Sequence, residues 1–543
     1  MGNCLGTTSI SSSNRAAAAP AALPIDTLFK FPSPPPTLPP GGGFATGEID
    51  LGGLQLRQVT SFHKIWTAPG DLGATFLEPS DIPDGFSMLG CYAQPNNQPL
   101  FGWVLVAKTN AADQSGEILK QPTDYTLVIS ANDDPNSAHF WLPTPPDGFR
   151  AVGLVVTASP EKPPLDKLRC VRSDFTDEAE SESLIWGDAT GNVNVYGLRP
   201  KARGSNAKSV SVGTFTVQSN AVALSCLFNK SSVLSAMPNQ AQIEAVFRSY
   251  APYIYFHPDE TYLPSSVNWY FSNGVLLYKK GEESKPVRVE PDGSNLPQGG
   301  SNDGSYWLDL PVEPDASIVK KGDLQSAEAY LHVKPVLGGS GTDIQVWVFY
   351  PFNGPATAKV GVVERIPLGR IGAHVGDWEH VTLRISNFDG ILRRVYFAEH
   401  SGGRWVDASR LEFDGGGGNR FVGYSSLNGH ATYAAAGVVM QGGGSAGIRN
   451  DTAKSAMVMD TGARFAVVAA AGVEEPPWLN YYRKWGPTRS YDSVGEVKRL
   501  ERLVPESLKG QLDKVVKALP AELFGEDGPT GPKMKNNWDG DEK

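Results

Sequence analysis

The sequence predicts a mainly β protein, and three features carry that prediction. Gly (59) and Pro (42) are abundant among the 543 residues, and both types break helices and mark turns. Short runs of β-branched and aromatic residues stand between turn residues, as in 101–106 and 125–129. No helical periodicity of useful length precedes about residue 239. The length and a hydrophobic content of 40% suffice for two or three domains with real cores.

The composition also excludes some classes of function. Asp and Glu (58) outnumber Lys and Arg (48), and the resulting net charge of −10 does not favour a nucleic-acid partner. The cysteines are too few and too scattered for a disulfide scaffold or a CxxC zinc motif, namely Cys4, Cys91, Cys170 and Cys226. They indicate a reducing, cytoplasmic compartment. No apolar run is long enough to span a membrane.

Residues 1–45 are predicted to be a disordered tail that carries an acylation site. Gly2 is the acceptor position for myristate, although Gly6 stands where the usual pattern has Ser or Thr. Cys4 could take palmitate, and two acyl chains make a stable anchor where one binds only marginally. The stretch 31–43, FPSPPPTLPPGGG, is typical of an extended tether. The alternative is an ordinary disordered tail without lipid.

Residues 46–235 are predicted to form a threefold β-prism-like domain, because a segment of this region recurs. PDGFSMLG at 83–90 is repeated as PDGFRAVG at 146–153, and a degenerate copy ends with SVSVG at 209–213. A repeated sheet unit cannot bury its face alone, so three units should pack around a shared axis. Coincidence is the alternative, since Pro-Asp-Gly is a common turn. Such a fold prescribes no particular chemistry.

Residues 236–493 are predicted to form an antiparallel β-sandwich that opens with a helix. Asn239 can cap a helix that runs to Tyr250, because apolar residues recur there at i, i+3, i+4 and i+7. Short strands and Gly-rich loops follow, and 344–350 is the strongest strand candidate. The second domain is thus mostly sheet, with a few peripheral helices.

Residues 494–524 are predicted to be helical, and residues 525–543 to be a polar, disordered tail. The helical region carries one apolar stripe that consists of Leu508, Leu512, Val515, Val516 and Leu519, and Pro520 ends it. We expect this helix to pack on the sandwich. A helix that binds a partner or a membrane is the alternative.

The most informative segment for function is 372–385, GAHVGDWEHVTLRI. From Asp377 onward the pattern has a period of two, so Asp377 and Glu379 share a face with apolar residues that point into the sandwich. An unpaired buried charge is costly, and a divalent cation would compensate for it. With His374 on the preceding turn, the set suits Mg²⁺, Mn²⁺ or Ca²⁺. The alternative is that backbone N–H groups or upstream arginines, Arg365 among them, satisfy both acids.

Further polar residues are expected near this cluster. The turn NFDG at 387–390 returns the chain as a hairpin and places Glu399 and His400 on the neighbouring strand. His430 lies on a loop and could approach from a distance, whereas His380 should face outward on the opposite side. These residues form no recognisable set of nucleophile, base and orienting group, so no catalytic residue is predicted.

Seven segments spread from residue 31 to residue 493 resemble a known family. They are FPSPPPTLPPGGGFATGEIDLGGL (31–54), FHPDETYLPSSVNWYF (256–271), GSNLPQGGSNDGSYWLDLP (293–311), WVFYPFNGPATAKVGVV (347–363), HVGDWEHVTLRISNF (374–388), EHSGGRWVDASRLEF (399–413) and WGPTRSYDS (485–493). Together they resemble the plant branch of the vacuolar protein sorting-associated protein 62 family. The resemblance implies a role in protein delivery to the vacuole. The first domain also resembles the β-prism of multivesicular-body-associated proteins, which would suit endosomal work.

A second, local resemblance is chemically sharper. The segment that ends at Glu379 is similar to necrosis- and ethylene-inducing cytolysins, whose motif GHRHDWE holds a divalent metal and helps dock a membrane sphingolipid. His374, Asp377 and Glu379 match the first His, the Asp and the Glu of that motif. The chain departs from it at Ala373 and at the two positions after His374. The cytolysins are also secreted and disulfide-bonded, whereas this chain shows no secretory signal.

Three functions follow from these observations. The first is a non-enzymatic peripheral membrane protein in vacuolar or endosomal trafficking. Its partners would be membrane lipids or glycolipids and trafficking proteins, at the cytosolic face of the plasma, endosomal or vacuolar membrane. The second is a metal-dependent lipid- or glycan-binding protein of defence. The third is a metal-dependent hydrolase, in which a cation held by His374, Asp377 and Glu379 activates water.

Overall fold

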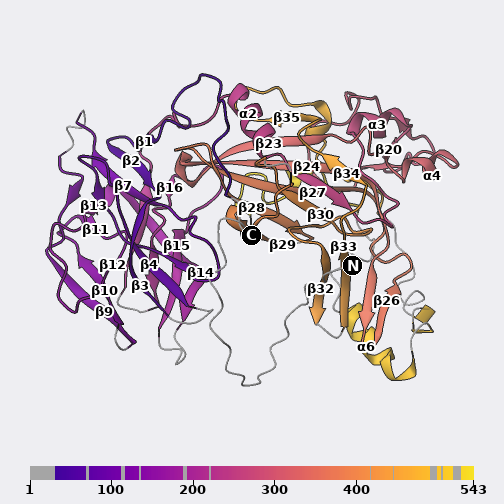
Figure 1. Cartoon of the computed structure of the whole chain (residues 1–543). Coiled ribbons are helices and arrows are strands. Elements are labelled where there is room, and N and C mark those ends of the chain that lie inside the picture. The colour runs from indigo at the N-terminus through magenta and orange to yellow at the C-terminus, as the bar shows by residue number, and fades with distance from the viewer. Residues whose placement is uncertain are drawn as a thin grey trace.

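The computed structural model describes residues 31–68, 73–111, 116–133, 136–187, 193–218, 222–400, 402–415, 418–443, 446–488, 498–499, 501–502, 505–517 and 528–542. Strands dominate these residues and helices are few, which confirms the prediction of a mainly β protein. The sheets of the N-terminal half and those of the C-terminal half lie side by side (Figure 1). The predicted acylation positions Gly2 and Cys4 lie outside the described residues.

The N-terminal half repeats one arrangement of strands. The strands are β1 (Glu48–Asp50), β2 (Leu54–Val59), β3 (Phe62–Thr67), β4 (Ala74–Pro79), β5 (Ser87–Met88), β6 (Tyr92–Pro95), β7 (Val104–Thr109), β8 (Leu119–Lys120), β9 (Asp124–Asp133), β10 (Asn136–Thr144), β11 (Phe149–Arg150), β12 (Val155–Thr157), β13 (Cys170–Arg172), β14 (Thr176–Gly187), β15 (Asn194–Pro200), β16 (Ser209–Val210), β17 (Phe215–Val217) and β18 (Ser225–Phe228). The sets β3-β4-β6, β9-β10-β12 and β14-β15-β17 share one order. The sets β2-β7-β5, β8-β13-β11 and β14-β18-β16 share another.

Residues from the three sets meet in the interior of this half. A Cβ atom added at Gly90 would lie 2.8 Å from the Cα atom of Gly153, so only glycine allows these two segments to approach so closely. The rings of Phe76 and Phe140 are 4.9 Å apart, and that of Phe215 lies 5.4 Å from Phe76. One core therefore joins strands β4, β10 and β17.

A six-stranded sheet forms the centre of the C-terminal half. Its order is β29 (Gly402–Asp407), β28 (Leu392–Glu399), β27 (His374–Ser386), β24 (Gly341–Asn353), β23 (Ala329–Val336) and β35 (Phe465–Ala469). A four-stranded sheet faces it, with the order β31 (Thr432–Tyr433), β30 (Val422–Ser425), β19 (Tyr253–Phe256) and β34 (Val458–Asp460). The ladders β23–β35 and β19–β30 are parallel, so these two sheets are mixed rather than purely antiparallel as predicted.

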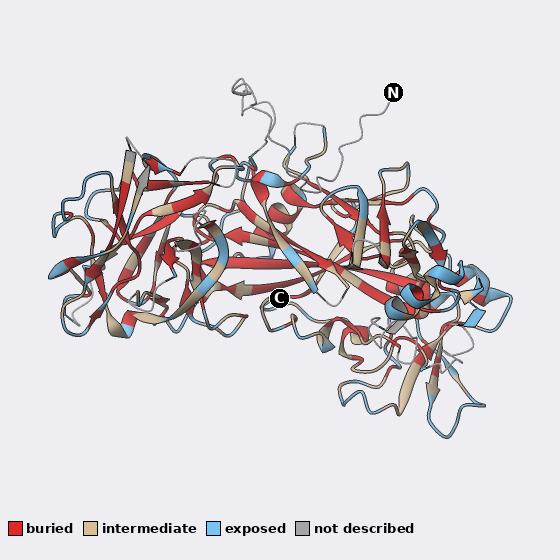
Figure 2. Ribbon diagram, turned by 90° about the horizontal axis from the view of Figure 1, so that it is seen from below, coloured by how far each residue is buried: buried red, intermediate tan, exposed pale blue. Residues whose placement is uncertain are grey.

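Apolar residues cover both faces of the six-stranded sheet. Val346 and Val381 lie on one face, in a core shared with Ile254 of β19. Trp347 and Trp378 lie on the other face, in a second core. Its cover includes α3 (Val267–Ser272), α4 (Asp315–Val319) and the strands β20 (Leu276–Lys279) and β22 (Tyr306–Asp309). The short strand β21 (Val287–Arg288) pairs with β20 and is exposed. The long central strands are accordingly buried along most of their length (Figure 2).

The predicted helix at the start of this half is present as α2 (Gln240–Tyr250). The Asn239 side chain accepts a hydrogen bond from the Gln242 backbone, and the Gln242 side chain accepts one from Asn239, which forms a capping box. Ile243, Val246, Phe247 and Tyr250 are buried, as the periodicity predicts.

A third sheet extends from the C-terminal half together with a helix (Figure 1). It contains β26 (Val363–Pro367), β25 (Thr357–Val360), β33 (Ala446–Thr452) and β32 (Gly437–Gly443). Leu512 of α6 (Glu506–Lys517) is buried against Ala358 and Val360, and Leu508 packs beside it. The rest of the predicted stripe, Val515, Val516 and Leu519, lies outside the residues whose side chains are described.

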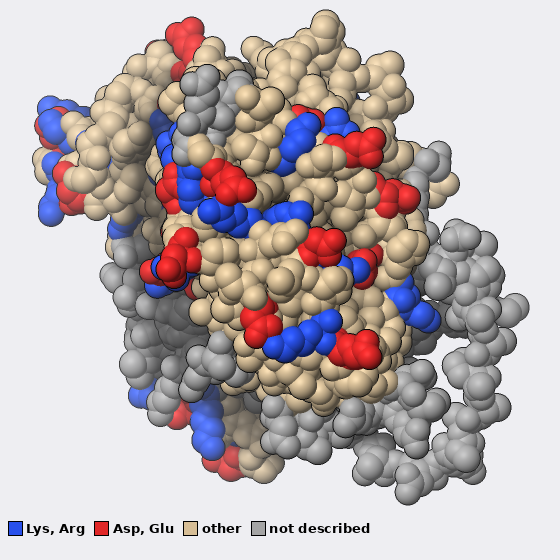
Figure 3. Space-filling model, turned by 90° about the vertical axis from the view of Figure 1, so that its left-hand side faces the viewer, with Lys and Arg blue, Asp and Glu red and all other residues tan. Residues whose placement is uncertain are grey.

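The two halves are joined by polar contacts as well as by apolar packing. Arg394 forms an ion pair of 2.7 Å with Glu182, and the Gln58 side chain donates to the Asp389 carboxylate at 2.8 Å. At the end of the molecule formed by the N-terminal half, basic and acidic side chains are interspersed (Figure 3). That end therefore presents mixed charge.

The prediction of a disordered C-terminal tail is wrong for residues 528–542, which we call the C-terminal segment. It includes a short turn of helix, η6 (Pro532–Met534), and lies against the sheets of the C-terminal half. Trp538 is buried and stacks on His332 at 3.7 Å, and Lys334 donates to backbone carbonyls of the segment. The polar composition led to the prediction of disorder. That prediction failed because the residues that hold the segment in place are distant in sequence.

Candidate functional site

The candidate site lies where two strands of the six-stranded sheet separate. The ladder between β27 and β24 extends to the pair His374–Asn353, but the ladder between β27 and β28 begins only at Val381–Phe397. Residues 374–380 therefore have a paired strand on one side and a cavity of about 570 Å³ on the other. Such an opening exposes polar groups at the edge of an otherwise buried sheet.

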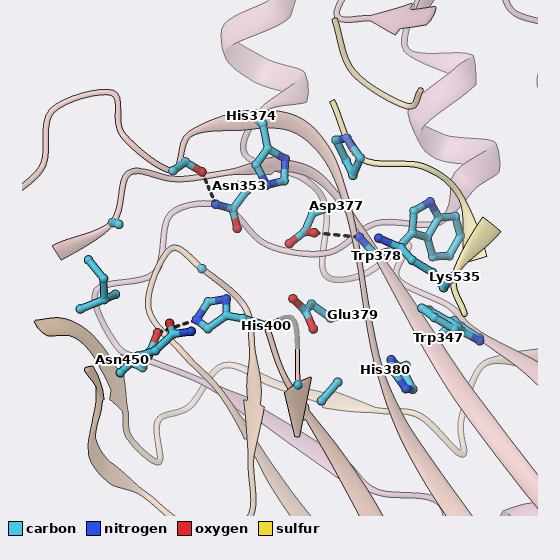
Figure 4. Close-up of a pocket in the computed structure, with 18 of the residues that line it drawn as sticks. Trp347, Asn353, His374, Asp377, Trp378, Glu379, His380, His400, Asn450 and Lys535 are labelled. Carbon is cyan, nitrogen blue, oxygen red and sulfur yellow. Dashed lines mark hydrogen bonds between the residues drawn. The ribbon is translucent and has the colours of Figure 1, made fainter. Parts of the chain in front are cut away.

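The structure brings the three predicted residues His374, Asp377 and Glu379 to this one pocket (Figure 4). Asp377 and Glu379, which we call the pocket acids, continue the face that carries Val381, as the period of two predicts. Gly376 has φ +70°, and a Cβ atom there would lie 2.7 Å from the Trp485 carbonyl oxygen. This left-handed residue changes the phase of the strand, so His374 joins the acids.

Asp377 is held from inside the protein. Its Oδ1 accepts a hydrogen bond from the Trp378 backbone at 2.9 Å, and its Oδ2 lies 3.2 Å from Nδ1 of His430. His430 is fully buried and stacks on Tyr350 at 3.9 Å, which confirms that it approaches the cluster from its loop. Burial alone would raise the pKa of Asp377, but the contact with His430 and nearby positive charge lower it below its ordinary value.

Glu379 has the opposite electrostatic character. No hydrogen bond or ion pair to its carboxylate is found within the part of the chain that the structure describes. Burial and the charge of Asp377 raise the pKa of Glu379 well above its ordinary value. Two carboxylates that share a pocket cannot both be charged without cost. The pair therefore attracts a proton or a cation.

His374 is oriented by a hydrogen bond to a backbone carbonyl. Its Nδ1 donates to the Gly376 carbonyl at 2.8 Å, which leaves the lone pair of Nε2 without a proton in the neutral ring. Burial lowers the pKa of His374, although Asp377 opposes this shift. A neutral imidazole with one nitrogen fixed by a carbonyl is the usual state of a metal-binding histidine.

The opposite wall of the pocket comes from β28 and β33. His400 follows β28, and its Nε2 contacts Oδ1 of Asn450 at 2.9 Å; both residues line the pocket. The hairpin therefore places His400 beside the cluster, as the sequence predicts. Glu399 pairs with Arg404 at 2.8 Å and is not among the residues that line the pocket. Arg365 pairs with Asp451 at 3.1 Å and does not satisfy the acids either.

The prediction that His380 faces outward is wrong. It does lie on the face opposite Glu379, but it is buried there, stacks on Trp347 at 4.3 Å and lies 3.1 Å from Oε1 of Glu542. The cause is the C-terminal segment, which covers that face. His380 is thus a structural residue at the back of the site.

Sequence reasoning missed the contribution of the C-terminal segment to the pocket. Lys535, Asn537 and Glu542 line it, and the Lys535 side chain extends toward Asp377 (Figure 4). One signal could have revealed this packing, because Trp538 is a large apolar side chain in an otherwise polar tail.

The described side chains of the pocket do not form a closed metal cage. Among the described residues, no group of three or more His, Cys, Asp and Glu side chains converges in an arrangement that could hold a metal ion. The pocket acids nevertheless lie in one pocket with His374 and are only partly compensated. Mg²⁺ is commonly held by one or two carboxylates together with water or substrate oxygens. Asp377 and Glu379 fit that mode, with His374 nearby.

Fold and site together define a mainly β protein with an acidic pocket at an opened sheet edge. The described part of the chain includes no helix that is long and apolar enough to cross a membrane. Residues 25–542 match the family model of vacuolar protein sorting-associated protein 62, and the chain belongs to that family. No curated protein matches the chain.

Solved structures show a distant resemblance. GNIP1Aa from Chromobacterium piscinae is 19% identical with a TM-score of 0.28, and the match covers 36% of this chain and 40% of that one. NLPPya in complex with glucosamine is 15% identical with a TM-score of 0.20, covering 35% and 67%. Necrosis and Ethylene inducing Protein 2, from the causal agent of cocoa's witches' broom disease, is 12% identical with a TM-score of 0.19, covering 35% and 67%.

Proposed function

We propose that the protein is a non-enzymatic peripheral membrane protein in vacuolar protein targeting or endosomal trafficking. In this proposal the pocket binds a polar group of a membrane lipid or glycolipid with the help of a divalent cation. Membership of the vacuolar protein sorting-associated protein 62 family supports the trafficking role. The observation that carries the binding role is the partly compensated pair Asp377 and Glu379 in an open pocket of about 570 Å³.

The proposed cation is Mg²⁺, Mn²⁺ or Ca²⁺, because carboxylate oxygens are the ligands that these ions prefer. Asp377 and Glu379 would hold it, with His374 as a third ligand. Bound there, the cation would supply positive charge to oxygen atoms of the ligand. The chain would contribute the orientation of the acids, since Asp377 is fixed by His430 and by the Trp378 backbone.

The N-terminal half is proposed to be a β-prism that serves as a second membrane or partner module. The repeated strand orders support this proposal, as does the close approach of Gly90 and Gly153 in its interior. The trafficking partners would be proteins or lipids at the same membrane.

The membrane anchor is proposed to be acylation of Gly2 and Cys4 at the cytosolic face of the plasma, endosomal or vacuolar membrane. Replacement of both residues by Ala should move the full-length protein from the membrane fraction to the supernatant of expressing cells. Partitioning that does not change would remove the anchor from the proposal. This experiment tests the anchor alone, and the cation site has its own test.

The direct test of the binding role is a vesicle and glycan screen with purified protein. Vesicles of neutral phospholipid, anionic phospholipid and glycosphingolipid, and a glycan array, are each tested with Ca²⁺ or Mg²⁺ and again with excess chelator. We expect binding that the chelator abolishes and that the double variant Asp377→Asn, Glu379→Gln lacks. Binding that is equal with and without chelator, and equal in the variant, would contradict the proposal.

A further inference from the structure

The C-terminal segment forms one wall of the pocket and is fixed from several sides. Glu542 accepts hydrogen bonds from Thr382 at 2.5 Å and from Gln345 at 2.9 Å. Asp541 pairs with Arg384 at 2.7 Å and with Arg203, in the N-terminal half, at 2.9 Å. These contacts lie on buried or half-buried groups, so the segment is part of the folded protein.

These anchors hold Lys535 at the mouth of the pocket. Lys535 lines the pocket with Asp377 and Glu379, and its side chain extends toward Asp377 (Figure 4). It forms no ion pair within 4.0 Å in the part of the chain that the structure describes, so its ammonium group acts on the acids from across the pocket. Burial and Asp377 raise the pKa of Glu379, and the Lys535 charge opposes them.

We propose that Lys535 is a built-in cation of the acidic pocket, which competes with a divalent cation and must swing aside when one binds. This inference rests on the proposed function and names the residue that sets the affinity and selectivity of the site. Because the backbone of the segment is anchored, the Lys535 ammonium group stays beside the pocket. Because the side chain is long and flexible, the ammonium group can move out when a divalent cation binds.

The charges in the pocket explain the expected selectivity. Lys535 already places one positive charge in a pocket that the carboxylates of Asp377 and Glu379 line. A monovalent cation would gain little by replacing it, whereas a divalent cation compensates for both carboxylates at once. The pocket therefore favours divalent over monovalent cations more strongly with Lys535 present than without it.

The test replaces Lys535 by Met, which keeps most of the length of the side chain and removes its charge. Lys535→Arg keeps the charge, and Lys285→Met makes the same change at an exposed lysine outside the pocket. Binding of CaCl₂, MgCl₂ and MnCl₂ to each full-length protein is measured by titration calorimetry, with thermal melting in chelator as a check of folding. A repeat in 0.5 M KCl measures competition by a monovalent cation.

We expect Lys535→Met to bind the divalent cation at least about tenfold more tightly than the wild type, and to lose more affinity in KCl. Lys535→Arg and Lys285→Met should behave as the wild type. Equal affinity of the wild type and Lys535→Met would overturn this inference and leave the proposed cation site intact. Binding by none of the proteins, Lys535→Met included, would overturn the cation site and the inference together.

Discussion

Two pairs of acids, one in β27 and one in the C-terminal segment that packs against it, have different electrostatic surroundings. Asp541 and Glu542, which we call the anchor acids, meet His380, Thr382 and two arginines. Although burial raises the pKa of Glu542, His380 and the hydrogen-bond donors around it lower that pKa to about 2. The pocket acids lie close to each other instead, and the pKa of Glu379 is raised well above its ordinary value.

The difference lies in the hydrogen-bond donors that each carboxylate meets. A buried carboxylate with a full set of donors stabilises the contact that holds it, and its removal leaves those donors unpaired. Glu379 meets no such donor among the described residues, and a buried carboxylate of this kind weakens the fold when it is charged. Glu542 and Glu379 should therefore respond in opposite directions to substitution and to pH.

The largest effect is expected at the anchor. Glu542→Ala should lower the free energy of unfolding by about 3 kcal/mol, because Thr382, Gln345 and His380 lose a buried partner. Urea denaturation at pH 7 measures the change. Asp539→Ala, at an exposed position of the same segment, is the matched control and should stay within about 0.5 kcal/mol of wild type. If Glu542→Ala loses no more stability than this control, the segment is not anchored through the Glu542 carboxylate.

Acid should weaken the anchor region. His332, stacked on Trp538, has a pKa lowered from 6.5 to about 3, mainly by burial. The unfolded chain therefore binds a proton below pH 6.5 that the folded chain does not bind, and stability is lost as the pH falls toward 3. Between pH 6.5 and pH 5 this loss amounts to about 2 kcal/mol. His332→Gln should remove that part of the pH dependence in denaturation curves, and an unchanged slope would contradict the assignment.

High pH should lower the stability of the protein through Glu379. Because the folded pKa of Glu379 is raised above 4.5, its contribution to stability is present at low pH and is lost as the pH rises through the raised value. Glu379→Gln has no such loss and should be more stable than wild type at pH 8 in the absence of divalent cation. Thermal melting at pH 5 and pH 8 in chelator checks this. A variant less stable than wild type at pH 8 would show that Glu379 is a structural acid like Glu542.

Local pattern was enough to predict parts of the fold and of the site. The capping residue Asn239 and the spacing of Ile243, Val246 and Phe247 predict α2, and all four residues lie in the helix or directly before it. Likewise, the period of two after Asp377 places both pocket acids on the core face. Each of these statements depends on neighbours a few residues away.

The parts that were missed depend on distant partners. Glu542 reaches His380 across 162 residues of sequence, and Lys535 enters the pocket only because Trp538 and the anchor acids hold the segment. The separation of β27 from β28 is a tertiary feature that no local pattern encodes. A glycine at position 376 is compatible with the change of phase in the strand. The contact that requires a glycine there is with the Trp485 carbonyl, which is remote in sequence.

The central claim is that the pocket acids form a divalent-cation site, and calorimetric titration of purified full-length protein with CaCl₂, MgCl₂ and MnCl₂ tests it most directly. The wild type is compared with two double variants. The pocket variant carries Asp377→Asn together with Glu379→Gln. The control variant carries Asp539→Asn together with Glu161→Gln, which makes the same change of charge at exposed positions. We predict saturable binding of one ion by the wild type and the control, and none by the pocket variant. Equal binding by all three proteins, or no binding by the wild type, would contradict the account.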